Sequence, residues 1–391
     1  MSGHQRKHAL DAIRAQVACS RPGREAPRSP VAPGPGAAGA DSGAAAPTPD
    51  ITLTDLIAHW RDAVPDRPRR TVLEMARSAR ELKAFARARG LDPLQRPTLI
   101  AWRDHLAGER GLAPKTIGKK LALIGAALQL AVDDGRLPYN PAARIRIHRP
   151  HGAPRSRVPF TVDGLNALFA SPVYRRGHRP RGGGGEAAYW LPLLGLFTGL
   201  RLEEAAQLRC RDLQVSDGIP YLLITADGHH TRLKTRSSER RIPLHAELLA
   251  RGLLDYHRHV RAQGADWLFP HLRPDCTGRR GGNWGKWFGR YLRRQVGIDD
   301  RRQVFHSLRH GFRQACREAG IEEEMADALL GHAGRSTGRR YGDLYPLRPL
   351  AEAMARIRYP GVHLPPPWTV SGSDTAPFRP EQQRQAQEDS A

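Results

Sequence analysis

Cysteine and long apolar runs are scarce in this sequence. Only 4 of its 391 residues are cysteines, and none forms a Cys-x-x-Cys pair or lies near a histidine at zinc-finger spacing, which argues against a disulfide framework and a structural zinc site. The longest nearly apolar run, residues 189–200, is far shorter than the ~20 residues needed to span a bilayer. No apolar segment follows the charged N-terminus, so we expect a cytoplasmic protein without a secretory signal.

Acidic residues are also in the minority, with 39 aspartates and glutamates against 62 lysines and arginines and a formal net charge of +23. Such an excess describes the binding partner rather than the fold, and the usual partner is nucleic acid, with an anionic membrane surface second. The short apolar runs favour nucleic acid. Histidine is frequent, but the histidines near 228–230 lack carboxylates at helical spacing, so we expect solvated side chains rather than a metal site.

Both ends of the chain are predicted to be disordered. Residues 22–50 consist mainly of alanine, proline and glycine and cannot bury a core, so we predict a disordered tail over 1–50. The C-terminal stretch is similar in character, and we predict a second disordered tail over 359–391.

Residues 51–145 are predicted to form a small all-helical domain. Apolar residues recur at the spacing of amphipathic helices in four groups: Leu53, Leu56, Ile57 and Trp60; Val72, Met75, Leu82 and Phe85; Leu99, Trp102 and Leu106; and Ile117, Leu121, Ile124, Leu128 and Ala131. The fourth helix opens with three lysines that can meet a phosphate backbone: Lys115, Lys119 and Lys120. A solvated helix face explains any one of these lysines equally well.

A basic linker over 146–157 leads to a second domain of mixed elements, 158–358. Thr161 can cap its first helix, and two short strands are predicted on either side of a polar turn at 227–239. The glycine run within 175–187 predicts a flexible loop. The predicted fold class is therefore mainly α with a small β-sheet (α+β).

Two clusters of charged residues stand out in the second domain. Arg201 comes just after Gly199 at the end of an apolar helix, and Glu204 lies three residues on, on the same helical face. Further along the chain, His306 and Arg309 also share a helical face. Each cluster alone has an ordinary explanation, the first as an intrahelical Arg–Glu pair.

A third cluster, "LLGHAGRSTGRRYGDLY" at 329–345, contains an isolated tyrosine. Tyr341 follows His332 by nine residues and has too few apolar neighbours to be buried. A tyrosine that attacks a phosphate outside the protein needs such a polar, accessible segment. Tyr345, thirteen residues after His332, is the weaker candidate nucleophile, because it can also belong to a helical core.

The order and spacing of these residues resemble the signature of the tyrosine recombinase (phage integrase) family, which runs Arg, Lys, His-x-x-Arg, His or Trp, Tyr. The resemblance implies six catalytic residues: Arg201, Lys234, His306, Arg309, His332 and Tyr341. It covers about 157–355, and the preceding helices are similar to the family's core-binding (SAM-like) domain. Many relatives carry threonine where Gly311 and Gly338 stand here.

The resemblance also implies a reaction. Tyr341 would attack a DNA phosphodiester, form a 3′-phosphotyrosyl bond and free a 5′-hydroxyl. Arg201 and Arg309 would hold the non-bridging oxygens as donors that stay charged. Lys234 would act as general acid at the leaving oxygen, and His306 would take the tyrosine proton or orient the phosphate.

The remaining candidates act around this centre. His332 would donate a hydrogen bond to the phosphate, Glu204 would orient Arg201 or a histidine, and Arg240 is a further candidate DNA contact. We expect no cofactor. Two-metal phosphoryl transfer needs clustered carboxylates, and rejoining retains the energy of the phosphodiester, in line with the lack of a GxxxxGK loop.

The expected function is site-specific recombination, with integration or excision of a phage or genomic island in a GC-rich bacterium as the first hypothesis. The long N-terminal tail favours it over a Xer-type chromosome-dimer resolvase. A non-catalytic DNA-binding accessory protein and a type IB topoisomerase are the remaining candidate functions. The resemblance implies a homotetramer assembled on double-stranded DNA attachment sites, with host DNA-bending or directionality factors as candidate partners, in association with the nucleoid. The amphipathic segment 346–360 is predicted to dock on a neighbouring protomer.

Overall fold

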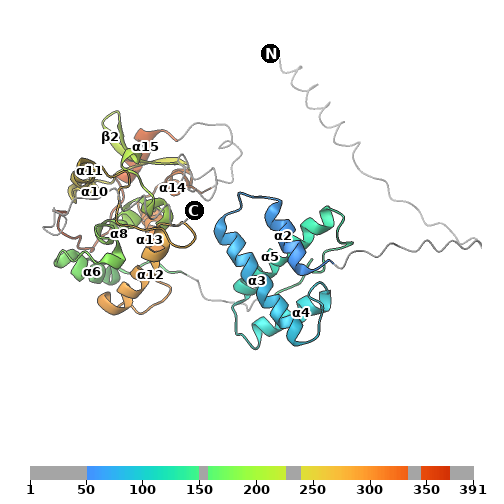
Figure 1. The fold of residues 1–391 in the computed structure, drawn as a ribbon. Helices are drawn as coiled ribbons and strands as arrows, with labels where there is room; N and C mark the ends of the chain where they lie inside the picture. Colours follow the sequence, from blue (N-terminus) through green and yellow to red (C-terminus); the bar gives the residue numbers. More distant parts are fainter. Residues whose placement is uncertain (1–50, 149–156, 226–238, 333–344, 370–391) are drawn as a thin grey trace, which may run out of the picture. The chain divides into compact units, whose positions relative to one another are not determined.

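The computed structural model describes residues 51–148, 157–225, 239–332 and 345–369 (Figure 1). These residues are mainly helical and include one antiparallel sheet of three strands, so the predicted α+β class is confirmed. Lys234 and Tyr341 lie outside the described residues. The predicted tail over 1–50 and most of the predicted linker also lie outside them, and the predicted domain limits stay predictions.

The four helices predicted within 51–145 are present. They are α2 (Leu53–Asp62), α3 (Arg69–Ala88), α4 (Arg96–Ala107) and α5 (Pro114–Asp133). Their predicted apolar faces form a common core, in which several side chains are fully buried: Leu56, Met75, Leu82, Leu99, Ile124 and Leu128. Proline begins α5, where its missing N–H costs no helical hydrogen bond, and the helix ends at Asp133, before Gly135 with a φ of 70°.

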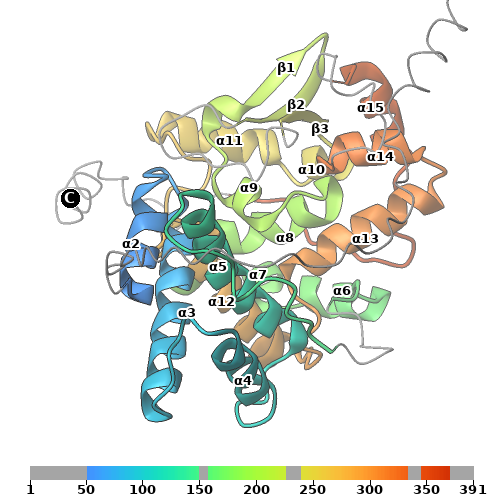
Figure 2. The ribbon, with the colours of Figure 1, turned by 90° about the vertical axis from the view of Figure 1, so that its right-hand side faces the viewer.

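Residues 157–369 contain several helices around one apolar helix. The first is α6 (Val162–Phe169), whose N–H at Gly164 donates to the predicted cap Thr161 at 3.1 Å. The apolar helix is α8 (Ala187–Thr198), which is buried on all sides and lies beside α13 (Phe305–Glu318) (Figure 2). The other helical segments are α7 (Pro172–Arg175), η1 (Arg181–Gly183), α9 (Leu202–Ala206), η2 (Cys210–Asp212), α10 (Ala246–Ala250), α11 (Leu253–Ala262), α12 (Gly281–Tyr291), the π-helical η4 (Leu292–Val296), α14 (Glu323–Leu330) and α15 (Leu347–Met354).

The sheet has the order β1 (Leu213–Ser216), β2 (Ile219–Ile224), β3 (Arg240–Pro243). Leu222 on the central strand is paired with Leu213 on one side and Ile242 on the other. The two predicted strands correspond to β2 and β3, whereas β1 was not predicted. The connection from β2 to β3 carries Lys234 in the sequence.

The glycine run predicted as a flexible loop is instead tightly packed. A Cβ atom on Gly183 would come within 2.9 Å of the Trp287 ring, and one on Gly184 within 2.5 Å of Leu272. Nearby, Arg179 and Glu186 form an ion pair at 2.8 Å with side chains only 10% and 5% exposed. The flexible-loop prediction is therefore wrong: these positions are glycine because neighbouring side chains occupy the space that a Cβ would need.

The disorder predicted for 359–391 is wrong for its first part. Trp368 is only 7% exposed, and its ring packs edge-on against Tyr256 with centroids 5.3 Å apart. The Trp368 N–H donates to the Arg251 carbonyl at 2.8 Å, and the Tyr189 hydroxyl donates to the Pro366 carbonyl at 2.7 Å. Trp368 thus anchors a segment that was predicted to be disordered because of its proline-rich composition. Residues 370–391 lie outside the described residues.

The amphipathic segment after Tyr345 has its predicted apolar face, but that face is covered by the same chain. Leu350, Met354 and Ile357 are at most 1% exposed, and α15 packs on β2, β3 and α14. His245 fixes the end of the segment by donating from Nε2 to the Ile357 carbonyl at 3.0 Å. The structure therefore corrects the prediction that this face docks on a neighbouring protomer.

Candidate active site

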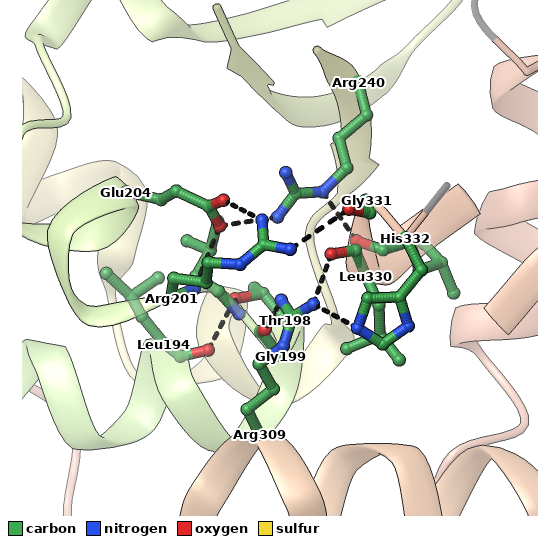
Figure 3. Close-up of polar contacts among 12 residues, drawn as sticks. Leu194, Thr198, Gly199, Arg201, Glu204, Arg240, Arg309, Leu330, Gly331 and His332 are labelled. Carbon is green, nitrogen blue, oxygen red and sulfur yellow. Dashed lines mark hydrogen bonds and ion pairs between the residues drawn. The ribbon is translucent and has the colours of Figure 1, made fainter. Parts of the chain in front are cut away.

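Three arginines from separate elements meet at the C-terminal end of α14 (Figure 3). Their guanidinium groups donate to three successive carbonyls: Arg240 to Leu329 at 2.7 Å, Arg309 to Leu330 at 2.6 Å and Arg201 to Gly331 at 3.2 Å. The last carbonyls of a helix have no partner within it and carry the negative end of the helix dipole. The end of α14 therefore stabilises a group of positive charges.

A sharp turn between α8 and α9 positions Arg201. Gly199 adopts a φ of 63°, and a Cβ there would lie 2.6 Å from the Phe312 ring. The left-handed turn ends α8, and Arg201 is the capping residue just before α9, with extended backbone angles. Arg201 and Glu204 were predicted on one helical face. The structure corrects this, because Arg201 lies just before its helix, yet the two side chains still meet.

Glu204 is the counter-ion of the cluster, although it is only 4% exposed. One carboxylate oxygen accepts from Arg201 Nη1 at 2.5 Å, and the other accepts from Arg240 Nη2 at 2.8 Å and from the Arg201 backbone N–H at 2.9 Å. Burial alone raises the pKa of Glu204, but the two arginines outweigh it and hold the pKa below its ordinary value. The predicted contact between Glu204 and Arg201 is present.

Arg240 was predicted to contact DNA, and the structure places it in the interior instead. Its side chain is 5% exposed, and the guanidinium is enclosed by Glu204 and the end of α14. Gly331 makes room for it, because a Cβ there would lie 2.7 Å from Arg240 Nη1. A group this enclosed cannot reach a phosphate backbone, so we correct the prediction and assign Arg240 to holding Glu204 and α14 together.

Arg309 is held from two sides. Its Nη1 donates to the Gly199 carbonyl at 2.6 Å while Nη2 donates to Leu330. Burial lowers the pKa of Arg309 to about 9, and the neighbouring charges of Arg201 and Arg240 act in the same direction. At neutral pH the guanidinium is still protonated, so it can bind an anion.

His306 lies three residues before Arg309 on α13 and is exposed. The imidazole is only partly removed from water, and this desolvation, followed by the charges of His310, Arg309 and Arg201, lowers the pKa of His306 to about 4. The imidazole is therefore neutral at neutral pH and can accept a proton. Its ring stands edge-on to His310, with centroids 4.9 Å apart.

His332 follows α14 directly and contacts Arg309. Its Nε2 lies 2.8 Å from Arg309 Nη2, and its Nδ1 lies 2.9 Å from Arg313 Nη1 and 3.1 Å from Asp327 Oδ1. Burial and the charge of Arg309 lower the pKa of His332, while Asp327 opposes the shift. The donor role toward phosphate that the resemblance implies for His332 stays a prediction.

The assembled charges define what the site can bind. Three guanidiniums around one carboxylate leave a formal excess of two positive charges, and Arg201 is the most accessible of the three arginines at 25% side-chain exposure. Such a group suits a phosphate whose oxygens gain charge in a transition state. The structure thus brings together Arg201, Arg309 and His332, with His306 nearby.

The lysines predicted to meet a phosphate backbone have different surroundings. Lys119 forms an ion pair with Glu74, and Lys120 Nζ donates to Glu81 at 2.6 Å. Lys115 is exposed. The solvated-face explanation suits Lys119, whose side chain is 54% exposed, whereas that of Lys120 is only 14% exposed and is bound by Glu81. A DNA contact of Lys115 stays a prediction.

The described residues were also searched for a metal-binding cluster and for a membrane-spanning helix. Within them, no group of three or more histidine, cysteine, aspartate or glutamate side chains could hold a metal ion. None of the helices they form is both long and apolar enough to cross a membrane.

Comparison with known proteins matches residues 188–348 to the phage integrase family. A tyrosine recombinase XerC of Chromohalobacter salexigens is 28% identical over 299 residues, which cover 74% of this chain and 88% of the relative. A tyrosine recombinase XerD of Caulobacter vibrioides is 25% identical over 247 residues, 62% of this chain and 75% of the relative.

Solved structures with a similar fold include two integrases. The Tn1549 transposon integrase in complex with transposon right end DNA has a TM-score of 0.53 at 20% identity, covering 78% of this chain and 98% of that one. A lambda integrase dimer bound to a COC′ core site has a TM-score of 0.51 at 17% identity, covering 75% and 77%. At these identities the likeness concerns the fold alone.

Proposed function

The chain belongs to the tyrosine recombinase family, and on that premise we propose that it is a site-specific recombinase that cuts and rejoins DNA through a 3′-phosphotyrosyl bond at Tyr341. The observation that carries the proposal is the group of guanidiniums on the last carbonyls of α14. Its excess of positive charge suits a phosphodiester, and the segment that contains Tyr341 follows α14 directly in the sequence.

The proposed step is an in-line exchange of phosphate esters. The Tyr341 oxygen bonds to phosphorus as the bond from phosphorus to the 5′ oxygen breaks. Arg201 and Arg309 hold the non-bridging oxygens in fixed positions as their charge grows. These guanidiniums are already oriented by Gly199, Leu330 and Gly331, so little reorganisation accompanies the reaction.

Two proton transfers accompany the step. His306 accepts the phenolic proton of Tyr341, for which its low pKa leaves it unprotonated at neutral pH. Lys234 protonates the leaving 5′ oxygen. Since the phosphotyrosyl bond keeps the energy of the phosphodiester, the reverse attack rejoins the strand, and the proposed reaction uses neither a metal nor ATP.

Within this class we propose integration or excision of a mobile element, by a homotetramer assembled on double-stranded attachment sites with host bending or directionality factors. The long tail over 1–50 supports this role. The second candidate is resolution of chromosome dimers, which is favoured by relatives that are named XerC and XerD at 25–28% identity. A plasmid assay that compares recombination between element-end sequences with recombination between chromosomal resolution sites distinguishes the two candidate functions.

The first test is a nicked suicide substrate, which loses a short 5′-hydroxyl fragment after cleavage and traps the covalent adduct. The substrate should carry an end sequence of the element that surrounds the gene. We expect a protease-sensitive adduct with the wild type and none with Tyr341→Phe, whereas DNA affinity stays the same.

Tyr345→Phe is the matched control, because Tyr345 is the other tyrosine of the segment. It should form the adduct at the wild-type rate. An adduct that persists in Tyr341→Phe would assign the nucleophile elsewhere. Binding of a verified site without any adduct would favour a DNA-binding accessory protein.

A further inference from the structure

The segment 175–186, which contains the packed glycines, also carries positive charge on its surface. Three of its arginines are exposed and form no ion pair or side-chain hydrogen bond with another described residue: Arg175, Arg176 and Arg181. The only acidic residue of the segment is Glu186, which is 4% exposed and already paired with Arg179. The segment therefore presents positive charge that no carboxylate of its own neutralises.

The interior of the segment fixes these three arginines in position. Its fourth arginine, Arg179, points inward, where Nη1 donates to the Val173 carbonyl at 2.8 Å and the guanidinium carbon lies 5.1 Å from the centre of the Tyr189 ring. A buried ion pair and a run of ordered glycines both cost free energy. What they achieve here is a fixed placement of the exposed arginines, and fixed groups lose less entropy when they bind a partner.

Two aromatic rings of α12 support the segment. The Val173 N–H, just before the segment, donates to the Tyr291 hydroxyl at 3.1 Å. Further along, a Cβ on Gly182 would lie 3.0 Å from the Trp287 ring. The Trp287 and Tyr291 rings stack with their centroids 5.0 Å apart. The segment thus lies along one side of α12.

The exposed face of α12 continues the positive charge. Lys286 and Arg290 come one residue before Trp287 and Tyr291, and because they are four residues apart they share a helical face. Both are exposed, and neither is paired with another described residue. No acidic residue occurs between 281 and 298. We call the five cations of the segment and of α12 the basic surface: Arg175, Arg176, Arg181, Lys286 and Arg290.

We propose that the basic surface binds the phosphate backbone of duplex DNA beside the position that is cleaved. The inference rests on the proposed function, which makes DNA the substrate. Phosphate oxygens suit arginines that are exposed, unpaired and fixed in place, and such contacts position a protein on DNA without reading its sequence. By contrast, Arg70 and Arg258 are exposed but each is paired with a carboxylate of its own helix, as a solvated surface requires.

The helix α8 gives the distance from the basic surface to the candidate active site. It begins at Ala187, directly after the segment, and ends at Thr198, three residues before Arg201. Its 12 residues span about 18 Å. Since successive phosphates of one DNA strand are about 3.4 Å apart along the axis, we expect contacts about five base pairs from the cleaved phosphate.

The first test is the salt dependence of binding to two duplexes of equal length, one with the element-end sequence and one with a random sequence. In Arg175→Ala/Arg176→Ala/Arg181→Ala, the slope of log affinity against log salt should fall by about 0.9 for each lost phosphate contact. The loss should be the same on both duplexes, because phosphate contacts do not depend on sequence. An unchanged slope would overturn the proposal.

Arg258→Ala is the matched control for Arg181→Ala. Arg258 is 77% exposed but paired with Asp255 on α11, so its removal should leave the slope unchanged, whereas Arg181→Ala should lower it by about one. Equal changes in the two variants would show that the slope reports net charge alone, against the proposal. Unfolding temperatures equal to that of the wild type show that these surface variants are folded.

Ethylation of single phosphates locates the contact. Binding of the wild type to the element-end duplex should be weakened by an ethyl group about five base pairs from the cleaved phosphate. The triple variant should lose this interference and keep the one at the cleaved phosphate. Identical patterns for the two proteins would contradict the proposal. So would a triple variant that binds DNA normally but does not recombine, because that result indicates a protein partner.

One further variant separates placement from charge. Glu186→Gln makes the protein more positive, but it removes the partner of the buried Arg179 and should therefore weaken DNA binding. Tighter binding would show that charge alone matters and that the fixed placement does not. If the wild type forms no covalent adduct, the proposed function fails, while the slopes and the interference pattern still decide whether the basic surface binds DNA.

Discussion

Two regions of the molecule each place a carboxylate between two cations, and they differ in their access to water. In the helices over 53–133, Glu74 is paired with Arg70 and Lys119. The two cationic side chains are 56% and 54% exposed, so water and salt screen the charges, and such pairs contribute little to stability.

Glu204 is also paired with two cations, Arg201 and Arg240, but almost without contact with water. The Glu204 and Arg240 side chains are 4% and 5% exposed. Charges removed from water interact more strongly and are costly when left unpaired. A carboxylate between two cations is therefore a solvated surface in one region and part of a candidate phosphate site in the other, and burial makes the difference.

The largest expected effect comes from removing the charge in each region. Glu204→Gln leaves Arg201 and Arg240 without their carboxylate and should reduce the free energy of unfolding by about 3–5 kcal/mol. Glu74→Gln should cost less than about 1 kcal/mol. Hydrogen exchange of α9 and of α3 measures each loss locally, since a chain of this size need not unfold in one step. Equal losses would contradict the comparison.

A smaller effect is expected from His306 as the pH changes. Its pKa is about 4 in the folded protein against an ordinary 6.5. As the pH falls, the unfolded chain is therefore protonated at His306 before the folded chain is. Stability should therefore fall as the pH drops from about 6.5 towards 4, and His306→Gln should lack this part of the loss. Unfolding of both proteins across this range measures the difference. The exposure of His306 keeps the effect modest.

The same low pKa sharpens the proposed role of His306. If its neutral form accepts the tyrosine proton, the rate of adduct formation should stay constant from neutral pH down to about 5. A rate that falls with a midpoint near 6.5 would show that His306 has its ordinary pKa or that another group accepts the proton.

The smallest effect concerns the lysines of α5. Lys115→Ala should weaken DNA binding and lower the slope of log affinity against log salt by about one, because one phosphate contact is lost. Lys120→Ala should change neither, since Glu81 already binds Lys120. Titrations of DNA at several salt concentrations measure both. An equal change in the two variants would show that the ion pair opens when DNA binds.

The elements that could be predicted from the sequence are those that carry their own pattern. The four helices over 53–133 were predicted because each repeats its apolar residues at helical spacing, which needs no long-range information. The strand β1 was missed because its apolar residues are few and one of them, Val215, is 64% exposed. The packed glycines and the Trp368 anchor were missed because their partners, Trp287 and Tyr256, are distant in sequence.

The candidate site was likewise predicted only in part. The ordered motifs identified Arg201, Arg309 and His332, which the structure brings together. The burial of Arg240 was missed, and so were the contacts of Asp327 and Arg313 with His332. A local sequence does not show whether an arginine will be buried, because that depends on which helix end and which carboxylate fold against it.

The three arginines bind the end of α14 through its main-chain carbonyls. The backbone N–H groups of His332 and Gly331 donate to the carbonyls of Asp327 and Ala328. Each of the next three carbonyls accepts a hydrogen bond from a different arginine. Exchanging side chains one at a time leaves these oxygens in place. Loss or gain of one residue in α14 would turn its end by about 100° and separate all three arginines from their oxygens. The three arginines therefore constrain the length of this helix.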